Sequence, residues 1–148
     1  MAGAVDEGLF IGSGLNGTVY SIQVPTNGLV LLGGDFSLFN GVARSGLARL
    51  NLDGSLDVPD GNLDLGFNPV VDARGPGLPA SVRALAVVAS GTNAGKVVVG
   101  GLFPGVNGAA RLNLARLNAD GSTDLTFNPG AGVNNLVSAL ALQSDGRV

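Results

Sequence analysis

Two long phrases in this chain are near copies of each other, and this repetition constrains the fold more than any single motif does. Residues 31–55 read LLGGDFSLFNGVARSGLARLNLDGS, and residues 98–122 read VVGGLFPGVNGAARLNLARLNADGS. A shorter phrase, LDLGFNP at residues 63–69, returns as TDLTFNP at residues 123–129. Self-similarity over tens of residues is typical of repeat proteins, in which each repeat is one structural unit that packs against its neighbours.

A third shared phrase places the ends of the repeats. The segment GSGLNGTVYSIQV at residues 12–24 matches GAGVNNLVSALAL at residues 130–142. The chain is therefore predicted to consist of four parts and to be a fragment of a longer array. These parts are the tail of a preceding repeat at residues 1–15, a first whole repeat at 16–80, a second at 81–135 and the start of a further repeat at 136–148.

Each whole repeat contains four pieces with the pattern of a β-strand. The first piece alternates large and small side chains, and the second is continuously apolar before it reaches Gly-Gly, which indicates burial on both faces. Turn signals such as Asn27-Gly28 and Asp120-Gly121 separate the pieces. The last piece ends in Phe-Asn-Pro, and because proline has no N–H we expect it at a sheet edge. In the second repeat the pieces are residues 82–87, 96–103, 114–119 and a short segment that ends at residues 127–129.

Four antiparallel strands per unit, buried on both faces and repeated, are typical of the blades of a β-propeller. The paired glycines, Gly33-Gly34 and Gly100-Gly101, are expected to permit a bulge or a close approach of two backbones. Two whole repeats cannot close a ring that typically needs four or more blades, so the predicted fold is an open, all-β fragment of a propeller. The side chains predicted to be most buried are Val30, Leu32, Phe36, Phe67, Val97, Val99, Phe103 and Phe127.

Several of these phrases resemble the delta-60 repeat family. They are GGDF…NGVAR, LARLNADGS and TDLTFNPG, together with DGRV at residues 145–148, and the resemblance covers nearly the whole chain from about Asp6 onward. It implies a propeller-like repeat of bacterial proteins that are often large and extracellular. It implies no catalytic residues.

Composition excludes several classes of function. The chain has no cysteine and no histidine, so a Ser-His-Asp or Cys-His catalytic group and a zinc-finger-type site cannot form. A net charge of −3 with scattered cationic residues argues against nucleic acid as a partner. The longest apolar runs are far shorter than a membrane-spanning segment, and we expect no membrane insertion.

The strongest candidate for a binding site is a repeated acidic turn. Residues 51–57 read NLDGSLD and residues 118–124 read NADGSTD, which partly resembles a calcium loop. Each turn offers two carboxylates and one asparagine, whereas calcium takes six to eight oxygens, and no bidentate glutamate follows. We therefore expect Asp53 and Asp120 to form plain Asp-Gly turns without a metal.

The recurring arginines are a second candidate. Arg44 and Arg111 follow an Asn-Gly turn, and Arg49 and Arg116 lie inside the third strand. They have the chemistry to bind acidic glycans or carboxylates. A residue that returns in every repeat is more typical of a structural clamp, so we expect Arg49 and Arg116 to pair with an acid or carbonyl and to hold strands or blades together.

The remaining motifs indicate little chemistry. Gly12–Gly14 and Gly130–Gly132 are expected to be linkers, because no helix pattern follows them as a dinucleotide fingerprint requires. The sequon at Asn16 is interpreted as a coincidence in a loop. Paired carboxylates of a glycosidase could in principle come from Asp57, Asp60 or Asp64, but these lie in a turn insertion where carboxylates are usually solvated.

The sequence thus predicts a non-enzymatic repeat scaffold, without cofactor or catalytic residues, in an extracellular or cell-surface bacterial protein. Its partners would be further repeats of the parent chain and a protein or carbohydrate bound by the blade loops. Low aromatic content, 5%, weakens the carbohydrate alternative. A hydrolase or lyase propeller with channel-facing carboxylates and a purely structural spacer in a large adhesin remain as alternatives.

Overall fold

The computed structural model describes residues 12–51 and 67–148, and within these ranges the protein is all-β with no helix. It also contains no helix there that is long and apolar enough to cross a membrane. The strands are β1 (Thr18–Gln23), β2 (Val30–Asp35), β3 (Leu38–Phe39), β4 (Val42–Ala43), β5 (Leu47–Leu50), β6 (Ser81–Val87), β7 (Val97–Leu102), β8 (Gly105–Val106), β9 (Ala109–Ala110) and β10 (Leu114–Leu117).

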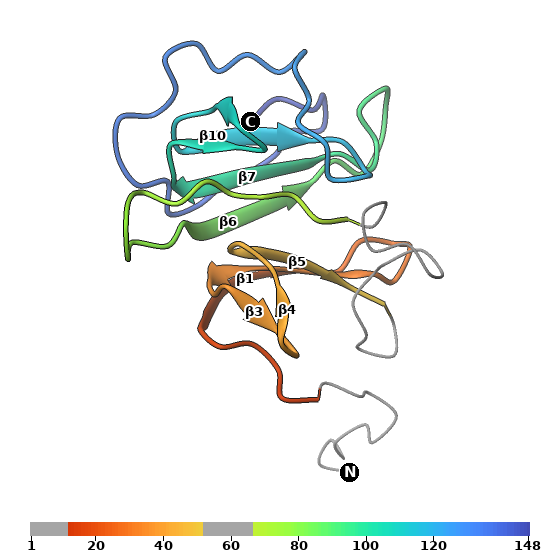
Figure 1. Ribbon diagram of the computed structural model, residues 1–148. Helices are drawn as coiled ribbons and strands as arrows, with labels where there is room; N and C mark the ends of the chain where they lie inside the picture. The colour runs from red at the N-terminus through yellow and green to blue at the C-terminus, as the bar shows by residue number, and fades with distance from the viewer. Residues whose placement is uncertain (1–11, 52–66) are drawn as a thin grey trace.

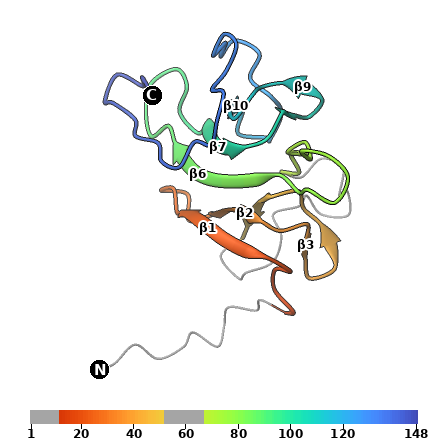
Figure 2. The same cartoon turned by 90° about the vertical axis from the view of Figure 1, so that its left-hand side faces the viewer.

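The strands form two equivalent sets, one in each whole repeat. The first repeat has an antiparallel sheet in the order β1-β2-β5, and the second has the matching sheet β6-β7-β10. The registers agree, because Val30 pairs with Leu50 and its counterpart Val97 pairs with Leu117. A two-stranded hairpin, β3-β4 or β8-β9, lies between the second and third strands of each set. The two sheets are stacked, with β6 between the first sheet and β7 (Figures 1 and 2).

Among the described residues, each of these sheets has three strands, whereas the sequence pattern predicted four. In the second repeat the fourth piece contributes only a single bridge, between Leu117 and Thr123. The chain then turns on itself, because the Thr126 N–H donates to the side chain of Asp124 and the Phe127 N–H to its carbonyl. These donors are not available to a ladder, and Pro129 has none. The matching stretch of the first repeat begins outside the described residues.

The small hairpins turn on Asn-Gly pairs. Asn40 and Gly41 have φ angles of 49° and 78°, and Asn107 and Gly108 have 52° and 73°. Positive φ at both central residues is the geometry of a tight hairpin turn, which asparagine and glycine adopt at low cost. The same Asn side chains also bind the segment that enters each repeat, so these turns fix the path of the chain between repeats.

The second glycine of each Gly-Gly pair permits the predicted close approach of two backbones. A Cβ atom on Gly34 would collide with the carbonyl of Thr18, and one on Gly101 with the carbonyl of Ser81. The ladder register shifts at this level, between Val19 and Ser21 in β1 and between the matching residues in β6. The expected bulge is therefore confirmed in both repeats.

The first glycine of each pair receives side chains of the next repeat. A Cβ on Gly33 would lie 2.6 Å from Val82 Cγ1 and 3.2 Å from Leu85 Cδ1. A Cβ on Gly100 would meet Val137 Cγ1 and Leu140 Cδ1 at the same distances. Segment 137–142 is not in a strand, because within the described residues no second strand pairs with it, yet it packs on β7 as β6 packs on β2.

Two hydrophobic clusters fill the molecule. The larger joins the two repeats, because Leu31, Leu47 and Phe67 of the first pack with the inward side chains of the second. The smaller cluster, which includes Leu32 and Phe36, lies on the other face of the first sheet.

Six of the eight side chains predicted to be most buried are buried, and Val30 and Phe127 are only half-buried. Phe67 is covered by the second repeat, whereas no complete further blade lies over Phe127 in the described chain.

Candidate functional site

In the acidic turn of the second repeat, the Asp120 carboxyl accepts hydrogen bonds from donors within the same turn. Asp120 accepts hydrogen bonds from the backbone N–H and the hydroxyl of Ser122, at 2.9 and 2.6 Å, and these donors hold the pKa of its carboxyl below the usual value. Gly121 has a φ of 88° and donates its N–H to the carbonyl of Asn118. This confirms the tight Asp-Gly turn for this repeat. In the described part of the chain, no three acidic side chains come together as a metal site would need.

Asp124 is the centre of a buried cluster of charges. Its side chain is 3% exposed, and its Oδ2 accepts hydrogen bonds from Lys96 Nζ at 2.8 Å and from Arg116 Nε at 2.7 Å. The Thr126 hydroxyl and N–H donate to Oδ1. Burial raises the pKa of Asp124, but the hydrogen bonds from Lys96, Thr126 and Arg116 outweigh it and hold the pKa well below the ordinary value of 3.8. The carboxylate is fully engaged and is not available for acid–base chemistry.

The arginines of the third strands act as clamps. Arg116 pairs with Asp124, an acid of its own repeat, and its guanidinium lies 4.9 Å from the centre of the Phe127 ring. Arg49 lies 4.4 Å from the centre of the Phe67 ring and donates to the carbonyl of Ala119, which belongs to the second repeat. The predicted pairing with an acid or a carbonyl is thus confirmed, and Arg49 makes it across the two repeats.

Arg44 and Arg111 occupy matching positions beside the small hairpins. Each donates through Nη1 to the carbonyl of the residue before it, Ala43 or Ala110. Their Nε atoms are buried and have no hydrogen-bond partner among the described residues. Arg44 is 4% exposed, and this burial lowers its pKa. A guanidinium buried to this extent does not form an open surface for acidic glycans.

A further cluster, at the boundary of the two sheets, was not predicted from the sequence. Arg83 lies 3.7 Å from the centre of the Tyr20 ring and 3.7 Å from Asp35, and the Tyr20 hydroxyl donates to the same Asp35 oxygen at 2.9 Å. Ser81 accepts a hydrogen bond from Arg83 Nε. There was little indication of this cluster in the sequence, because Leu102 of β7 stands where the first repeat has Asp35, so the contact is not repeated.

Several predicted candidates lie outside the described residues, namely Asp53, Asp57, Asp60 and Asp64. Asp64 is in the phrase that matches the one containing Asp124. The Asn16 side chain accepts hydrogen bonds from the N–H groups of Ser37 and Leu38, both at 2.9 Å, and so fastens the loop in which it lies.

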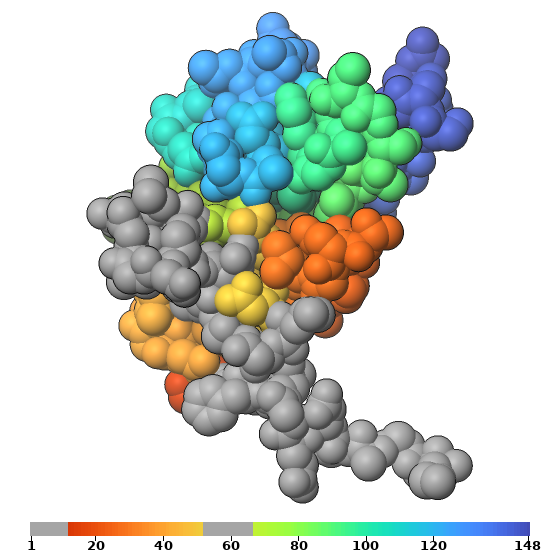
Figure 3. Space-filling model, turned by 90° about the vertical axis from the view of Figure 1, so that its right-hand side faces the viewer, coloured from red at the N-terminus to blue at the C-terminus, as the bar shows by residue number. Residues whose placement is uncertain are grey.

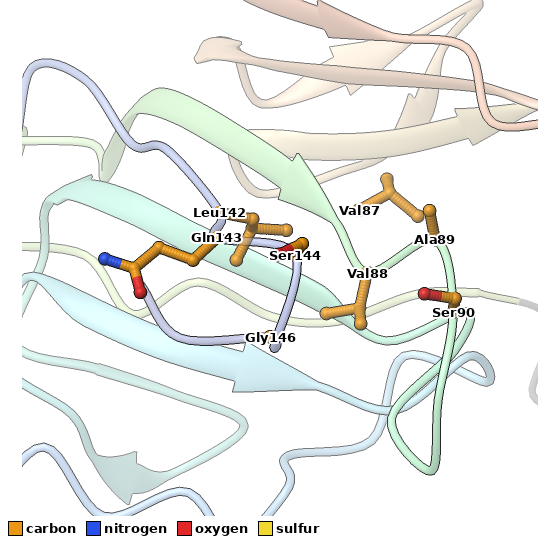
Figure 4. Close-up of a pocket in the computed structure, with 8 residues that line it drawn as sticks. All are labelled: Val87, Val88, Ala89, Ser90, Leu142, Gln143, Ser144 and Gly146. Carbon is orange, nitrogen blue, oxygen red and sulfur yellow. The ribbon is translucent and has the colours of Figure 1, made fainter.

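Two hollows lie between successive hairpin turns on one side of the molecule. We call the one of 420 Å³ between the first and second repeats the first turn groove, and the one of 380 Å³ between the second repeat and the C-terminal segment the second turn groove. Figure 3 shows the three turns side by side on this face, and Figure 4 shows the second groove. Residues 23–27, 87–89, 94 and 95 line the first groove, and residues 87–90, 142–144 and 146 line the second.

The grooves share a neutral character. None of the side chains that line them is charged or aromatic, and the stretch from Val87 to Ala89 forms a wall of both. Ala89 and Ser90 are exposed at the rim. Such a surface offers apolar and uncharged polar side chains.

Comparison with known proteins identifies the repeat. A family model described as "domain of unknown function (DUF5122) beta-propeller" matches residues 26–58 and 95–127. These segments contain the second and third strands of each sheet, including both Gly-Gly pairs. No curated protein and no solved structure matches the chain. The all-β fold and the two matches agree with the resemblance to delta-60 repeats, and together they support a β-propeller-like repeat in which two segments of the chain match this family model.

Proposed function

We propose that this chain is part of a non-enzymatic repeat scaffold that binds a partner through the turns at one side of its blades. The observation that carries the proposal is the recurrence of a neutral groove between successive turns, 420 and 380 Å³ in volume. Functional residues concentrate on loops that a rigid sheet positions, and a row of similar grooves presents the same chemistry repeatedly.

The charged groups support a structural role over an enzymatic one. Asp124 is bound by two cations and Thr126, and Arg49 and Arg116 stack on phenylalanine rings. Groups held in this way stabilise strands and cannot easily exchange protons with a substrate. The sequence also lacks histidine and cysteine, which removes the commonest bases and nucleophiles.

A protein is a better-supported partner than a carbohydrate. Sugars are usually held by stacking on tryptophan or tyrosine, and no aromatic residue lines either turn groove. The chain has no tryptophan, and its single tyrosine, Tyr20, is engaged by Arg83 and Asp35. An extracellular or cell-surface location in a bacterium is part of the proposal and rests on the resemblance to delta-60 repeats.

The test compares binding by the natural chain and by a groove variant. Ala89→Arg puts a long charged side chain at the rim shared by both grooves, and Ala131→Arg makes the same change at an exposed site in the linker. Displayed random peptides and a glycan array are the two probes. We expect selected peptides to lose at least about tenfold in affinity with Ala89→Arg and to be unaffected by Ala131→Arg.

Ligands that bind both variants equally would contradict the assignment of the grooves. Glycans that bind in an Ala89-dependent way would replace the peptide with a carbohydrate. Turnover of chromogenic glycosides or peptide substrates by the natural chain would overturn the non-enzymatic proposal.

A further inference from the structure

The chain enters the first repeat by the same path along which it enters the second. Leu15 forms a bridge with Phe39, and Val71 forms the matching bridge with Val106. Asn40 accepts a hydrogen bond from the Gly14 N–H at 2.7 Å. Its counterpart Asn107 accepts one from Val70 at 2.8 Å.

For the second repeat, the structure shows which part of the chain precedes this path. Shortly before Val70 come Phe67 and Pro69, which belong to the last strand-like piece of the first repeat and are buried; Phe67 lies in the core between the two sheets. Residues 12–15 therefore have the geometry of a linker that arrives from a preceding blade.

At the start of the second repeat and of the C-terminal segment, a pair of side chains packs on a glycine of the repeat before it. Val82 and Leu85 of β6 pack on Gly33, and Val137 and Leu140 of the C-terminal segment pack on Gly100. The matching pair in β1 is Val19 and Ile22. No glycine of a preceding repeat lies against it in the described residues.

The side chains at the start of the first repeat are accordingly more exposed than their counterparts in the second. Ile22 is 58% exposed and Val24 is 64% exposed. In the second repeat, Leu85 is 4% exposed and Val87 is partly buried against the core. Exposed branched aliphatic side chains next to each other on a strand indicate a surface that a partner covers.

We propose that this surface, formed by Ile22 of β1 and the adjacent Val24, is covered by a preceding repeat of the same polypeptide, whose second strand places a glycine against Ile22. The inference rests on the scaffold proposed above and names the surface by which it continues. The occupant is a repeat and not another protein, because the interface already present between the two sheets continues onto this face with the same pair of side chains. It belongs to the same polypeptide, because residues 12–15 follow the path of an inter-repeat linker.

The second strand of the preceding repeat must have a glycine at the position that matches Gly33. A side chain in place of Gly33 would meet Val82 and Leu85 within 3.2 Å, so any residue larger than glycine at the matching position would push Ile22 away. The preceding repeat is thus recognised by the absence of a side chain at one position, flanked by apolar residues.

The experiment adds a repeat to the full chain. A copy of residues 81–129, which ends in Phe-Asn-Pro, replaces residues 1–11 and joins directly to Gly12, as Pro129 joins Gly130. Because the chain has no cysteine, Ile22→Cys introduces a single thiol whose rate of reaction with a soluble maleimide reports its exposure.

We expect this thiol to react at least about 100-fold more slowly in the extended chain than in the natural chain, as is usual for groups that react only on local opening. Leu125→Cys of the original second repeat, where the native side chain is 70% exposed, should react at the same rate in both. Replacing the glycine copied from Gly100 by leucine should restore fast reaction at position 22.

Each other result overturns the inference. A thiol at position 22 that reacts equally fast in both chains would show that the face does not accept a repeat. The same would follow if a protease removed the added repeat while residues 12–148 stayed intact. A second extension, made with a copy of residues 18–69, controls for a poor choice of repeat. None of these results depends on Ala89, so a failure here is separate from a failure of the turn grooves to bind a partner.

Discussion

Charged residues, which are the usual candidates for catalysis or binding, hold the strands together in this protein. Asp124, Arg116 and Lys96 form one ion cluster behind the turn of the second repeat, and Arg49 reaches from the first repeat to Ala119. The first repeat has Leu29 where the second has Lys96, so its sequence lacks one of the two cations of this cluster. A charge that is buried must be paired, and here the pairing also fixes the fourth piece of the repeat.

Changing Asp124→Asn should destabilise the fold by about 3 kcal/mol, because Lys96 and Arg116 would keep their charges without a partner in a partly buried place. Chemical denaturation measures the loss. Asp120→Asn is the matched control, because that carboxyl is exposed and accepts hydrogen bonds from the neighbouring Ser122, and it should cost less than about 1 kcal/mol. Equal losses for the two variants would contradict a central role for Asp124.

The same cluster predicts how stability depends on pH. The pKa of Asp124 is lower in the folded chain than in the unfolded chain, so its contribution is complete above about pH 4 and is lost as the pH falls further through the folded value. Melts between pH 7 and pH 2 should therefore show a smaller acid-induced loss in Asp124→Asn than in the natural chain. Identical pH profiles would show that Asp124 is not linked to folding.

Calcium is expected to leave the protein unchanged. Asp120 and Asp124 already accept hydrogen bonds from neighbouring donors, and a metal would have to displace them before it gathered six oxygens. A thermal melt in millimolar calcium should give the same Tm as one in a chelator, within about 1 °C, because only an ion bound to the native state raises stability. A rise of several degrees that Asp120→Ala abolishes would establish a calcium site.

At the scale of the elements, the sequence predicted the strands well because the same pattern of apolar residues and turns occurs in both repeats. The continuous apolar runs became β2 and β7, and the glycine pairs became the points where strands approach closely. The fourth strand could not be predicted correctly, because the side chain of Asp124 takes the backbone donor of Thr126 and this local bond competes with a ladder. The turn grooves were not foreseen either, since they arise between repeats and involve no motif.

The close approach at Gly34 gives a test at this scale. Gly34→Ala would press a methyl group onto the carbonyl of Thr18 and force β1 and β2 apart, at a cost of about 3 kcal/mol. Gly41→Ala is the control, because no atom lies near its Cβ position and only its φ of 78° is strained, which costs about 1 kcal/mol. Urea denaturation compares the two. A smaller loss for Gly34→Ala than for Gly41→Ala would contradict the observed bulge.

At the scale of the whole molecule, the two repeats share one core, so they should unfold together. Phe67 belongs to the last strand-like piece of the first repeat, is 1% exposed and lies in the cluster formed mainly by the second repeat. A Cβ on Gly121 would lie 3.2 Å from the Phe67 ring, and the Arg49 guanidinium that stacks on this ring bonds to Ala119. Cooperativity therefore passes through a side chain that belongs to neither sheet, as in other repeat proteins where interfaces between units supply much of the stability.

Phe67→Ala should cost about 3–5 kcal/mol and weaken both sheets in a single transition, because it opens a cavity in their common core. Hydrogen exchange measures the stability of each repeat separately, and the amides of β2 and β7 should lose protection together. Phe127→Ala removes the equivalent ring where it is only half-buried, so its cost should be less than half as large. If β2 lost protection while β7 kept it, the repeats would be independent units. The scaffold would then gain nothing in stability from one blade to the next.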